Sequence, residues 1–115
     1  MSQDKRMQPR HHLITYSEVK RADDDTTVGF LIDVSTMGIR VISKHGFEPK
    51  GPVRLRVRLP ATIHGAEWVE LEAELLRCDK SSTPDHWESA MRMTHLDPDN
   101  QAILETAIGL YRFQN

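Results

Sequence analysis

VRLRVRL, residues 53–59, alternates apolar residues with arginine at every step. Side chains of a β-strand point to opposite faces with a period of two, so this stretch is typical of a strand with one apolar and one charged face. VELEAEL, residues 69–75, repeats the pattern with glutamate in the charged positions. Together the two stretches predict an antiparallel hairpin that turns at His64 and Gly65.

The charges of this hairpin predict how its strands pair. In the expected register each arginine of the first strand faces a glutamate of the second, in the pairs Arg58–Glu70, Arg56–Glu72 and Arg54–Glu74. Cross-strand pairs of opposite charge contribute a few tenths to about 1 kcal/mol each. A slip of one residue would turn the arginines toward the core. The arginine-rich strand is therefore interpreted as part of an ion-paired hairpin and not as a nucleic-acid-binding surface.

The remaining elements are predicted from composition and periodicity. Stretches rich in β-branched, aromatic or alternating apolar residues predict further strands at residues 12–20, 28–35, 39–43 and 87–95. Asp97 suits a helix N-cap and Pro98 suits the first helical position. An apolar stripe at helical spacing follows, formed by Ile103, Leu104, Ala107, Ile108 and Tyr111. We therefore expect a mainly β fold, a six-stranded antiparallel β-barrel with a C-terminal α-helix over residues 98–113.

The chain is expected to form one domain preceded by an arm. Its 115 residues suit a single domain. Residues 1–11 are polar and show no periodicity, so we expect a flexible N-terminal arm there and the barrel with its helix over residues 12–115. No internal repeat interrupts this arrangement.

Charge and cysteine content narrow the class of protein. The formal net charge is -2, whereas proteins that coat nucleic acid or membranes are usually strongly basic. Cys78 is the single cysteine, so the chain has no internal disulfide, which fits a reducing compartment. No signal peptide and no apolar run of about 20 residues is visible. We expect a cytoplasmic protein that neither inserts into a membrane nor binds DNA or RNA.

Neither a metal site nor a catalytic group stands out in the sequence. The six histidines show none of the spacings of a dedicated metal site. Ser35 lies near Asp33, but no histidine is placed to activate it as a nucleophile, and both residue types commonly build turns. We therefore expect a protein that is not an enzyme and that carries no metal and no cofactor.

Two polar stretches remain to be interpreted. One is KRMQPR, residues 5–10, ahead of the first predicted strand; the other is DVSTMG, residues 33–38, at the end of the second. Taken singly, the first is a solubilising tail. The second is a strand followed by a turn that needs glycine at a positive φ.

Taken together and in this order, the two stretches resemble the PilZ domain family. The resemblance rests on two motifs. One is a basic residue with Arg-x-x-x-Arg before the first strand, and the other is Asp-x-Ser-x-x-Gly at the end of the second. The arm, the six strands and the C-terminal helix fit the same family. The resemblance implies a six-stranded antiparallel barrel that is a bacterial receptor for the second messenger cyclic di-GMP. It also implies that the arm is a switch that wraps over the ligand.

The resemblance carries over to individual residues. It implies that the ligand is bound by Arg6, Arg10, Asp33, Ser35 and Gly38, with Lys5 and Arg77 as further contacts. Arginine can grip the O6 and N7 acceptors of guanine or a phosphate, and which of the two arginines does which stays open. The carboxylate of an aspartate can accept from the guanine N1 and N2 hydrogens. Strand alternation places Asp33 and Ser35 on the outer face, opposite Ile32 and Val34.

The last strand departs from the family pattern. Ala90 and Met93 stand where the family often has glycine and, three positions later, phenylalanine. Both residues are apolar, and we expect them to alter the packing of the core.

Three functions compete at this point. The first is a non-enzymatic receptor that binds cyclic di-GMP, orders its arm and signals through a protein partner. The second is a PilZ-like module that binds a protein and ignores nucleotide. The third is a small barrel for single-stranded nucleic acid, which would require exposed aromatic residues over a basic groove, whereas aromatic residues are only 6% of the chain.

Overall fold

The computed structural model describes residues 17–35, 37–47 and 49–114, with side chains up to residue 110. The predicted arm, residues 1–11, and the beginning of the first predicted strand, residues 12–16, lie outside the described residues.

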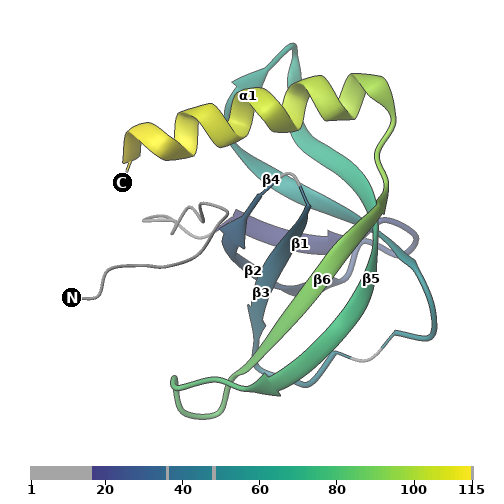
Figure 1. Cartoon of the computed structure of the whole chain (residues 1–115), viewed down its shortest axis with the longest axis vertical. Coiled ribbons are helices and arrows are strands. Elements are labelled where there is room, and N and C mark those ends of the chain that lie inside the picture. The colour runs from purple at the N-terminus through teal and green to yellow at the C-terminus, as the bar shows by residue number, and fades with distance from the viewer. Residues whose placement is uncertain (1–16, 36, 48, 115) are drawn as a thin grey trace.

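The described chain forms a closed barrel of six antiparallel strands followed by one helix (Figure 1). The strands follow one another around the barrel in the order β1-β2-β3-β6-β5-β4. The elements are β1 (Ser17–Arg21), β2 (Thr27–Val34), β3 (Gly38–Ser43), β4 (Val53–Ile63), β5 (Ala66–Lys80), β6 (Trp87–His95) and α1 (Pro98–Gln114). The predicted fold class, the number of strands and the helix are confirmed.

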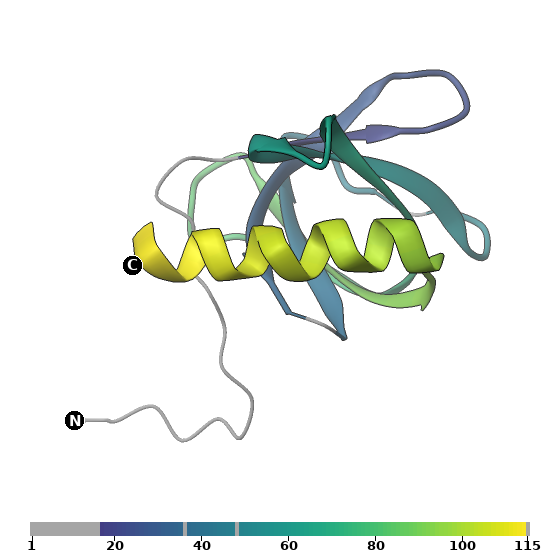
Figure 2. The same cartoon turned by 90° about the horizontal axis from the view of Figure 1, so that it is seen from above.

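The core of the barrel consists of the inward-facing residues of the alternating strands. Every strand supplies at least one fully buried or nearly buried apolar side chain, among them Val19, Leu31, Val41, Leu55, Leu71 and Met91. The predicted apolar stripe of the helix is buried at Leu104, Ala107 and Ile108. Since α1 packs against β4 and β5, it covers one end of the barrel, as the view from above shows (Figure 2).

The β4–β5 hairpin turns where the sequence predicts. His64 and Gly65 adopt positive φ values of 52° and 79°, and the residues on either side, Ile63 and Ala66, pair with each other. Positive φ at both central residues is typical of the tight two-residue turns that match the twist of a hairpin. The predicted turn is therefore confirmed.

The predicted register of this hairpin is wrong by two residues. Arg54 pairs with Glu72, Arg56 with Glu70, and Arg58 with Trp68. The cause is an irregularity between Arg58 and Ile63, where residues 59–62 of β4 stand opposite a single residue of β5. This segment contains Pro60, which cannot donate a ladder hydrogen bond. A shift of an even number of residues keeps every side chain on its face, so the arginines still point outward.

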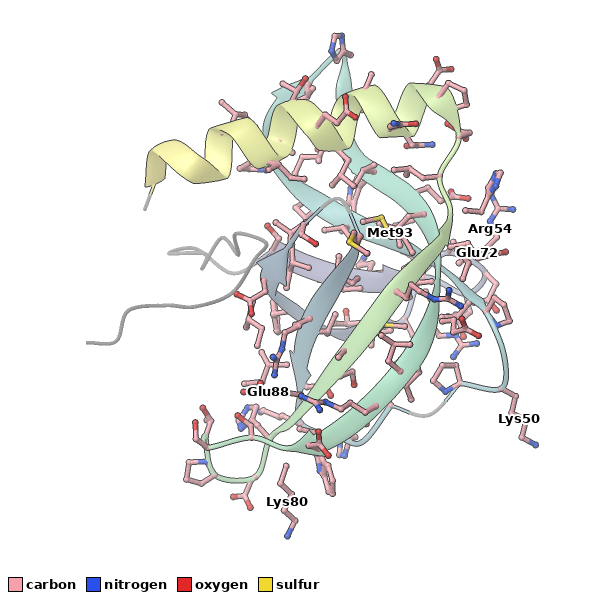
Figure 3. All side chains as sticks on the ribbon, in the orientation of Figure 1. Lys50, Arg54, Glu72, Lys80, Glu88 and Met93 are labelled. Atoms are coloured by element: carbon pink, nitrogen blue, oxygen red, sulfur yellow. The ribbon has the colours of Figure 1, made fainter. Side chains whose placement is uncertain are left out.

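The outward arginines of β4 consequently find other carboxylates. Arg54 forms an ion pair with Glu70, Arg56 with Asp25 at 3.1 Å, and Arg58 with Glu67 at 3.7 Å. Figure 3 shows Arg54 and Glu72 projecting from the outer side of the β4–β5 ribbon.

Trp68 organises the cations of the same face. The ammonium of Lys20 and the guanidinium groups of Arg56 and Arg58 lie 5.4, 5.0 and 5.3 Å from the centre of its ring. These are distances at which a cation is attracted to the face of an aromatic ring. Because the half-buried ring already holds three cations, this face does not offer the open aromatic platform that single-stranded nucleic acid requires.

Asp97 caps α1, as predicted, and ties the helix to the barrel. Its Oδ1 accepts a hydrogen bond from the Asn100 backbone N–H at 2.9 Å, and the Asn100 side-chain oxygen accepts one from the Glu70 backbone N–H at 3.1 Å. The backbone and side-chain hydrogen bonds from Asn100 lower the pKa of Asp97 below its usual 3.8. The cap thus stabilises the charged form of the carboxyl group.

Replacing Asp97 by alanine is expected to lower the melting temperature by a few degrees at neutral pH, because the first turn of α1 loses its cap. A lowered pKa in the folded state contributes stability above the unfolded pKa and loses it as the pH falls through the folded value. The difference between wild type and Asp97→Ala should therefore shrink below about pH 4. Thermal unfolding followed by circular dichroism against pH measures this, with Glu105→Gln on the same helix as the control. A difference that does not change with pH would contradict this role.

Candidate functional site

The motif residues lie where β2 ends and β3 begins. The Ser35 backbone N–H donates to the Gly38 carbonyl at 3.0 Å and closes the turn. The Ser35 hydroxyl oxygen accepts a hydrogen bond from the Met37 N–H at 3.2 Å. Ser35 is therefore a turn-building residue, as the simpler interpretation of the motif predicts. Its hydroxyl can still donate a hydrogen bond of its own.

Asp33 lies on the outer face of the barrel, opposite Val34, as predicted, although alternation counted from Leu31 would turn it inward. Leu31 and Val34 are both in the core, and a register shift between Leu31 and Asp33 makes Ile32 an extra residue. This β-bulge changes the phase of the strand by one residue. Because of it, β2 can bury Leu31 and Val34 and still present Asp33 outside.

The Asp33 side chain is enclosed by its neighbours and close to a cation. It is only 8% exposed, and its Oδ2 lies 3.9 Å from Nε of Arg40, with which Asp33 pairs across β2 and β3. Arg40 also donates to Glu88 Oε1 on β6 at 2.7 Å. Figure 3 shows Glu88 on the part of β6 that runs beside β3, away from α1. A carboxylate is thus held at the end of β2 with a guanidinium beside it.

A row of outward residues continues from Asp33 across four strands. Arg40 of β3 pairs with Ala90 of β6, and Ala90 pairs with Arg77 of β5. With strands about 4.8 Å apart, Arg77 stands roughly 15 Å from Asp33. Its side chain is exposed and lies 3.3 Å from Asp79. The structure therefore brings Asp33, Ser35 and Gly38 together and places Arg77 at the far end of the same row.

Ala90 does not lie in the core, which corrects the expectation for this position. Its neighbours Ser89 and Met91 face inward and are buried, whereas Ala90 pairs with the outward residues Arg40 and Arg77. Met93 is half-buried against the core, as expected, and lies between the barrel and α1 (Figure 3). The difference at Ala90 is thus a feature of the outer surface next to the site.

Gly38 is required by a close approach and not by a positive φ. It has no positive φ, contrary to the interpretation of the motif as a glycine-dependent turn. A Cβ atom built on Gly38 would lie 2.2 Å from the carbonyl oxygen of Met91 on the paired strand β6. The absence of a side chain at this position lets β3 and β6 come together beside Asp33.

The other predicted contacts are on the arm. Lys5, Arg6 and Arg10 lie outside the described residues, so the structure describes only the barrel part of the site. Sequence reasoning missed two residues of this part, Arg40 and Glu88. Arg40 stands between the apolar residues Ile39 and Val41, and this alternation directly after the motif is a signal for an outward arginine next to Asp33.

Other kinds of site find little support. Within the described ranges, no three His, Cys, Asp or Glu side chains come together as a metal ion would require. A hollow between the end of β6 and α1 has an apolar wall formed by Met93, Leu96 and Leu104. It lacks the cations that an anionic ligand needs, since its polar lining residues are Thr94, His95, Gln101 and Glu105. None of the described helical residues forms a segment long and apolar enough to span a lipid bilayer.

Comparison of the sequence with known families gives one match. The model of the PilZ domain family matches residues 4–109, which include both polar stretches, the whole barrel and most of α1. No protein with a curated description is similar enough in sequence to count as a match.

Comparison with solved structures finds chains of the same fold at low sequence identity. The inhibitor of motility MotI/DgrA of Bacillus subtilis superimposes with a TM-score of 0.70 at 19% identity, over 97% of this chain and 53% of that one. The PilZ domain of CeSA from a cellulose-synthesizing bacterium gives 0.52 at 22%, over 89% and 97%. The PlzA protein of Borreliella burgdorferi, solved in complex with c-di-GMP, gives 0.53 at 14%, over 90% and 47%. The chain spans about half the length of MotI/DgrA and PlzA, and at these identities the likeness is one of fold.

Gly38→Ala is expected to destabilise the barrel by about 1–3 kcal/mol or more, because the new methyl group meets a backbone carbonyl that cannot rotate away. Gly109→Ala is the matched control: nothing lies within 4 Å of its built Cβ in the middle of α1, so it should stabilise by roughly 0.5–1 kcal/mol. Chemical denaturation of the three proteins measures both effects. Equal stability of Gly38→Ala and wild type would contradict the close approach of β3 and β6.

Proposed function

Because this chain belongs to the PilZ domain family, whose domains are receptors and adaptors and not enzymes, we propose that it is a receptor for cyclic di-GMP. The ligand binds on the outer face at the β2–β3 turn. The observation that carries the proposal is the placement of Asp33, a nearly buried carboxylate that the β2 bulge holds on the outer face beside a complete Asp-x-Ser-x-x-Gly turn.

The carboxylate of Asp33 is suited to reading guanine. Guanine presents two adjacent N–H donors, N1–H and N2–H, on its Watson–Crick edge, and a carboxylate has two oxygens that can accept both. Adenine presents no such pair of donors to a carboxylate. The Ser35 hydroxyl contributes a further polar contact. Gly38 keeps β3 close to β6 and places no side chain beside Asp33 that would block the ligand.

The cations for the two phosphates come from the arm. Each arginine whose side chain the structure describes already lies within 4.0 Å of a carboxylate oxygen; they are Arg21, Arg40, Arg54, Arg56, Arg58, Arg77 and Arg92. A phosphate that bound one of these arginines would therefore have to compete with its carboxylate partner. Arg6 and Arg10, with Lys5 beside them, supply guanidinium and ammonium groups for phosphate or for the O6 and N7 atoms of guanine. Arg77 is an outer contact at the far end of the row.

Ligand binding is coupled to the arm in this proposal. Residues 1–11 close over the ligand, and Pro9 limits the conformations that the arm loses on ordering. The closed arm creates a new surface, which a protein partner recognises because it binds one state better than the other. As part of the same proposal, the receptor acts in the bacterial cytoplasm, without a cofactor and without DNA, RNA or membrane insertion.

Isothermal titration calorimetry with cyclic di-GMP tests the binding. Arg10→Ala and Asp33→Ala should each weaken the affinity about tenfold or more, because each removes a charge-assisted hydrogen bond worth about 1.5–3 kcal/mol. Lys50→Met, which removes an exposed cation of the loop between β3 and β4, is the control and should bind as wild type does. Circular dichroism checks that the variants are folded. No heat at tens of micromolar ligand would overturn the proposal.

The switch is tested by limited proteolysis with trypsin, which cleaves after arginine and lysine. Cleavage after Arg6 and Arg10 should be fast without ligand and should slow severalfold with saturating cyclic di-GMP, because an ordered arm does not fit the protease. In Asp33→Ala the same ligand concentration should give much less protection. An arm that resists trypsin equally with and without ligand would contradict the switch even if binding is confirmed.

A further inference from the structure

Three charged side chains on three neighbouring strands lie close together at the edge of the proposed site. Asp33 is on β2, Arg40 on β3 and Glu88 on β6. Arg40 Nη2 donates to Glu88 Oε1 at 2.7 Å, and Glu88 Oε2 accepts from the Ser81 hydroxyl at 2.9 Å. The other end of the Arg40 guanidinium, Nε, lies 3.9 Å from Asp33 Oδ2. Arg40 thus stands between two carboxylates and donates to one of them.

The distance between Arg40 and Asp33 is longer than that between Arg40 and Glu88, and it shows how the three charges act. At 3.9 Å the Arg40 Nε–H is beyond hydrogen-bond reach of Asp33, although it is close enough for electrostatic attraction. Nε is buried and has no hydrogen-bond partner in the part of the chain that the structure describes. A buried donor without a partner is unfavourable, so it needs a cause that holds the group in place. The short contact with Glu88 is that cause, because it fixes the far end of the guanidinium on β6.

We propose that Arg40 is a positioning residue for Asp33 and that Glu88 holds it at its working distance. Arg40 orients the enclosed carboxylate by electrostatic attraction without donating a hydrogen bond to it. Glu88 prevents Arg40 from moving onto Asp33 and donating there in competition with the guanine N–H groups. The inference rests on the proposed function, since it assumes that Asp33 contacts guanine.

The inference separates Arg40 from the other arginines of the outer face. Arg92 of β6 lies on the same face and forms an ion pair with Glu74 of β5, but it pairs with Gly38 and not with a motif side chain. A general loss of positive charge would make Arg92 as important as Arg40. A positioning role makes Arg40 important only while Asp33 is present.

The first experiment is a mutant cycle in cyclic di-GMP affinity, measured by calorimetry. Arg40→Met should weaken binding about tenfold, and adding it to Asp33→Asn should cost little more, because contacting residues are not additive. Glu88→Gln should weaken binding severalfold, but not in the Arg40→Met background. Arg40→Lys should recover part of the loss, and the control Arg92→Met should stay within about twofold of wild type, because Arg92 forms its ion pair with Glu74 and with none of the three charges.

Several results would overturn the inference. The inference fails if Arg40→Met binds within about twofold of wild type. It also fails if the loss of affinity in Arg40→Met simply adds to that in Asp33→Asn. Equal losses in Arg40→Met and Arg92→Met would show that only overall charge matters. If Arg40→Met does not fold, the same cycle of affinities is measured with Arg40→Lys and Glu88→Gln, singly and combined.

A second measurement separates this inference from the proposed function. Thermal unfolding of the ligand-free proteins tests whether Arg40→Met, Asp33→Asn and Glu88→Gln shift the melting temperature in a coupled way. If wild type does not bind cyclic di-GMP, the proposed function fails, while coupled shifts still support the arrangement of the three charges. Additive shifts, with or without ligand binding, overturn the inference.

Discussion

The structure depends on closing six strands around a narrow apolar core. Each strand must turn one face inward, so the inward positions are apolar, and many of them are β-branched, such as Val19, Val41 and Val69. Closure leaves no unpaired strand edge among the described strands. It also leaves no room inside for a nucleotide, because a barrel of this size is filled by its own side chains. Any ligand must therefore bind outside.

The requirement for an inward face conflicts with the outward placement of Asp33 at the end of β2, and a bulge resolves the conflict. Leu31 and Val34 both belong to the core although they are three residues apart. In a regular strand one of them would face outward. The extra residue Ile32 restores the phase, so that Asp33 stands outside next to Arg40. A second irregularity lies between Leu75 and Arg77 on β5, at the other end of the same row. Bulges commonly occur where a side chain must be redirected at a functional site.

Much of this fold could be predicted from the sequence, because alternation depends only on the inward and outward preference of each residue. The register of the β4–β5 hairpin could not, because Pro60 lies in an irregular segment that no alternation pattern reveals. Ala90 was assigned to the core because it is small and apolar, whereas its partners Arg40 and Arg77 show that it lies outside. Arg40 itself was missed because its role depends on Glu88, which lies on another strand 48 residues away in sequence. Residue types and spacing identified Asp33 and Ser35, but the charges around Asp33 are a product of the topology.

The charge balance of the barrel explains why the proposed site needs two parts. The described arginines of the barrel are all within ion-pair distance of carboxylates, and most of these pairs are exposed and individually weak. Such a surface can present an acceptor for guanine at Asp33, but it offers little net attraction to two phosphates. In the proposed receptor the cations of the arm would complete the site only when the arm is in place. Binding energy from the phosphates would then be available only to the closed state, and a ligand with different affinities for two states shifts the population between them. In a receptor built in this way, tight binding of the ligand requires closure of the arm, so that binding and the conformational change cannot be separated.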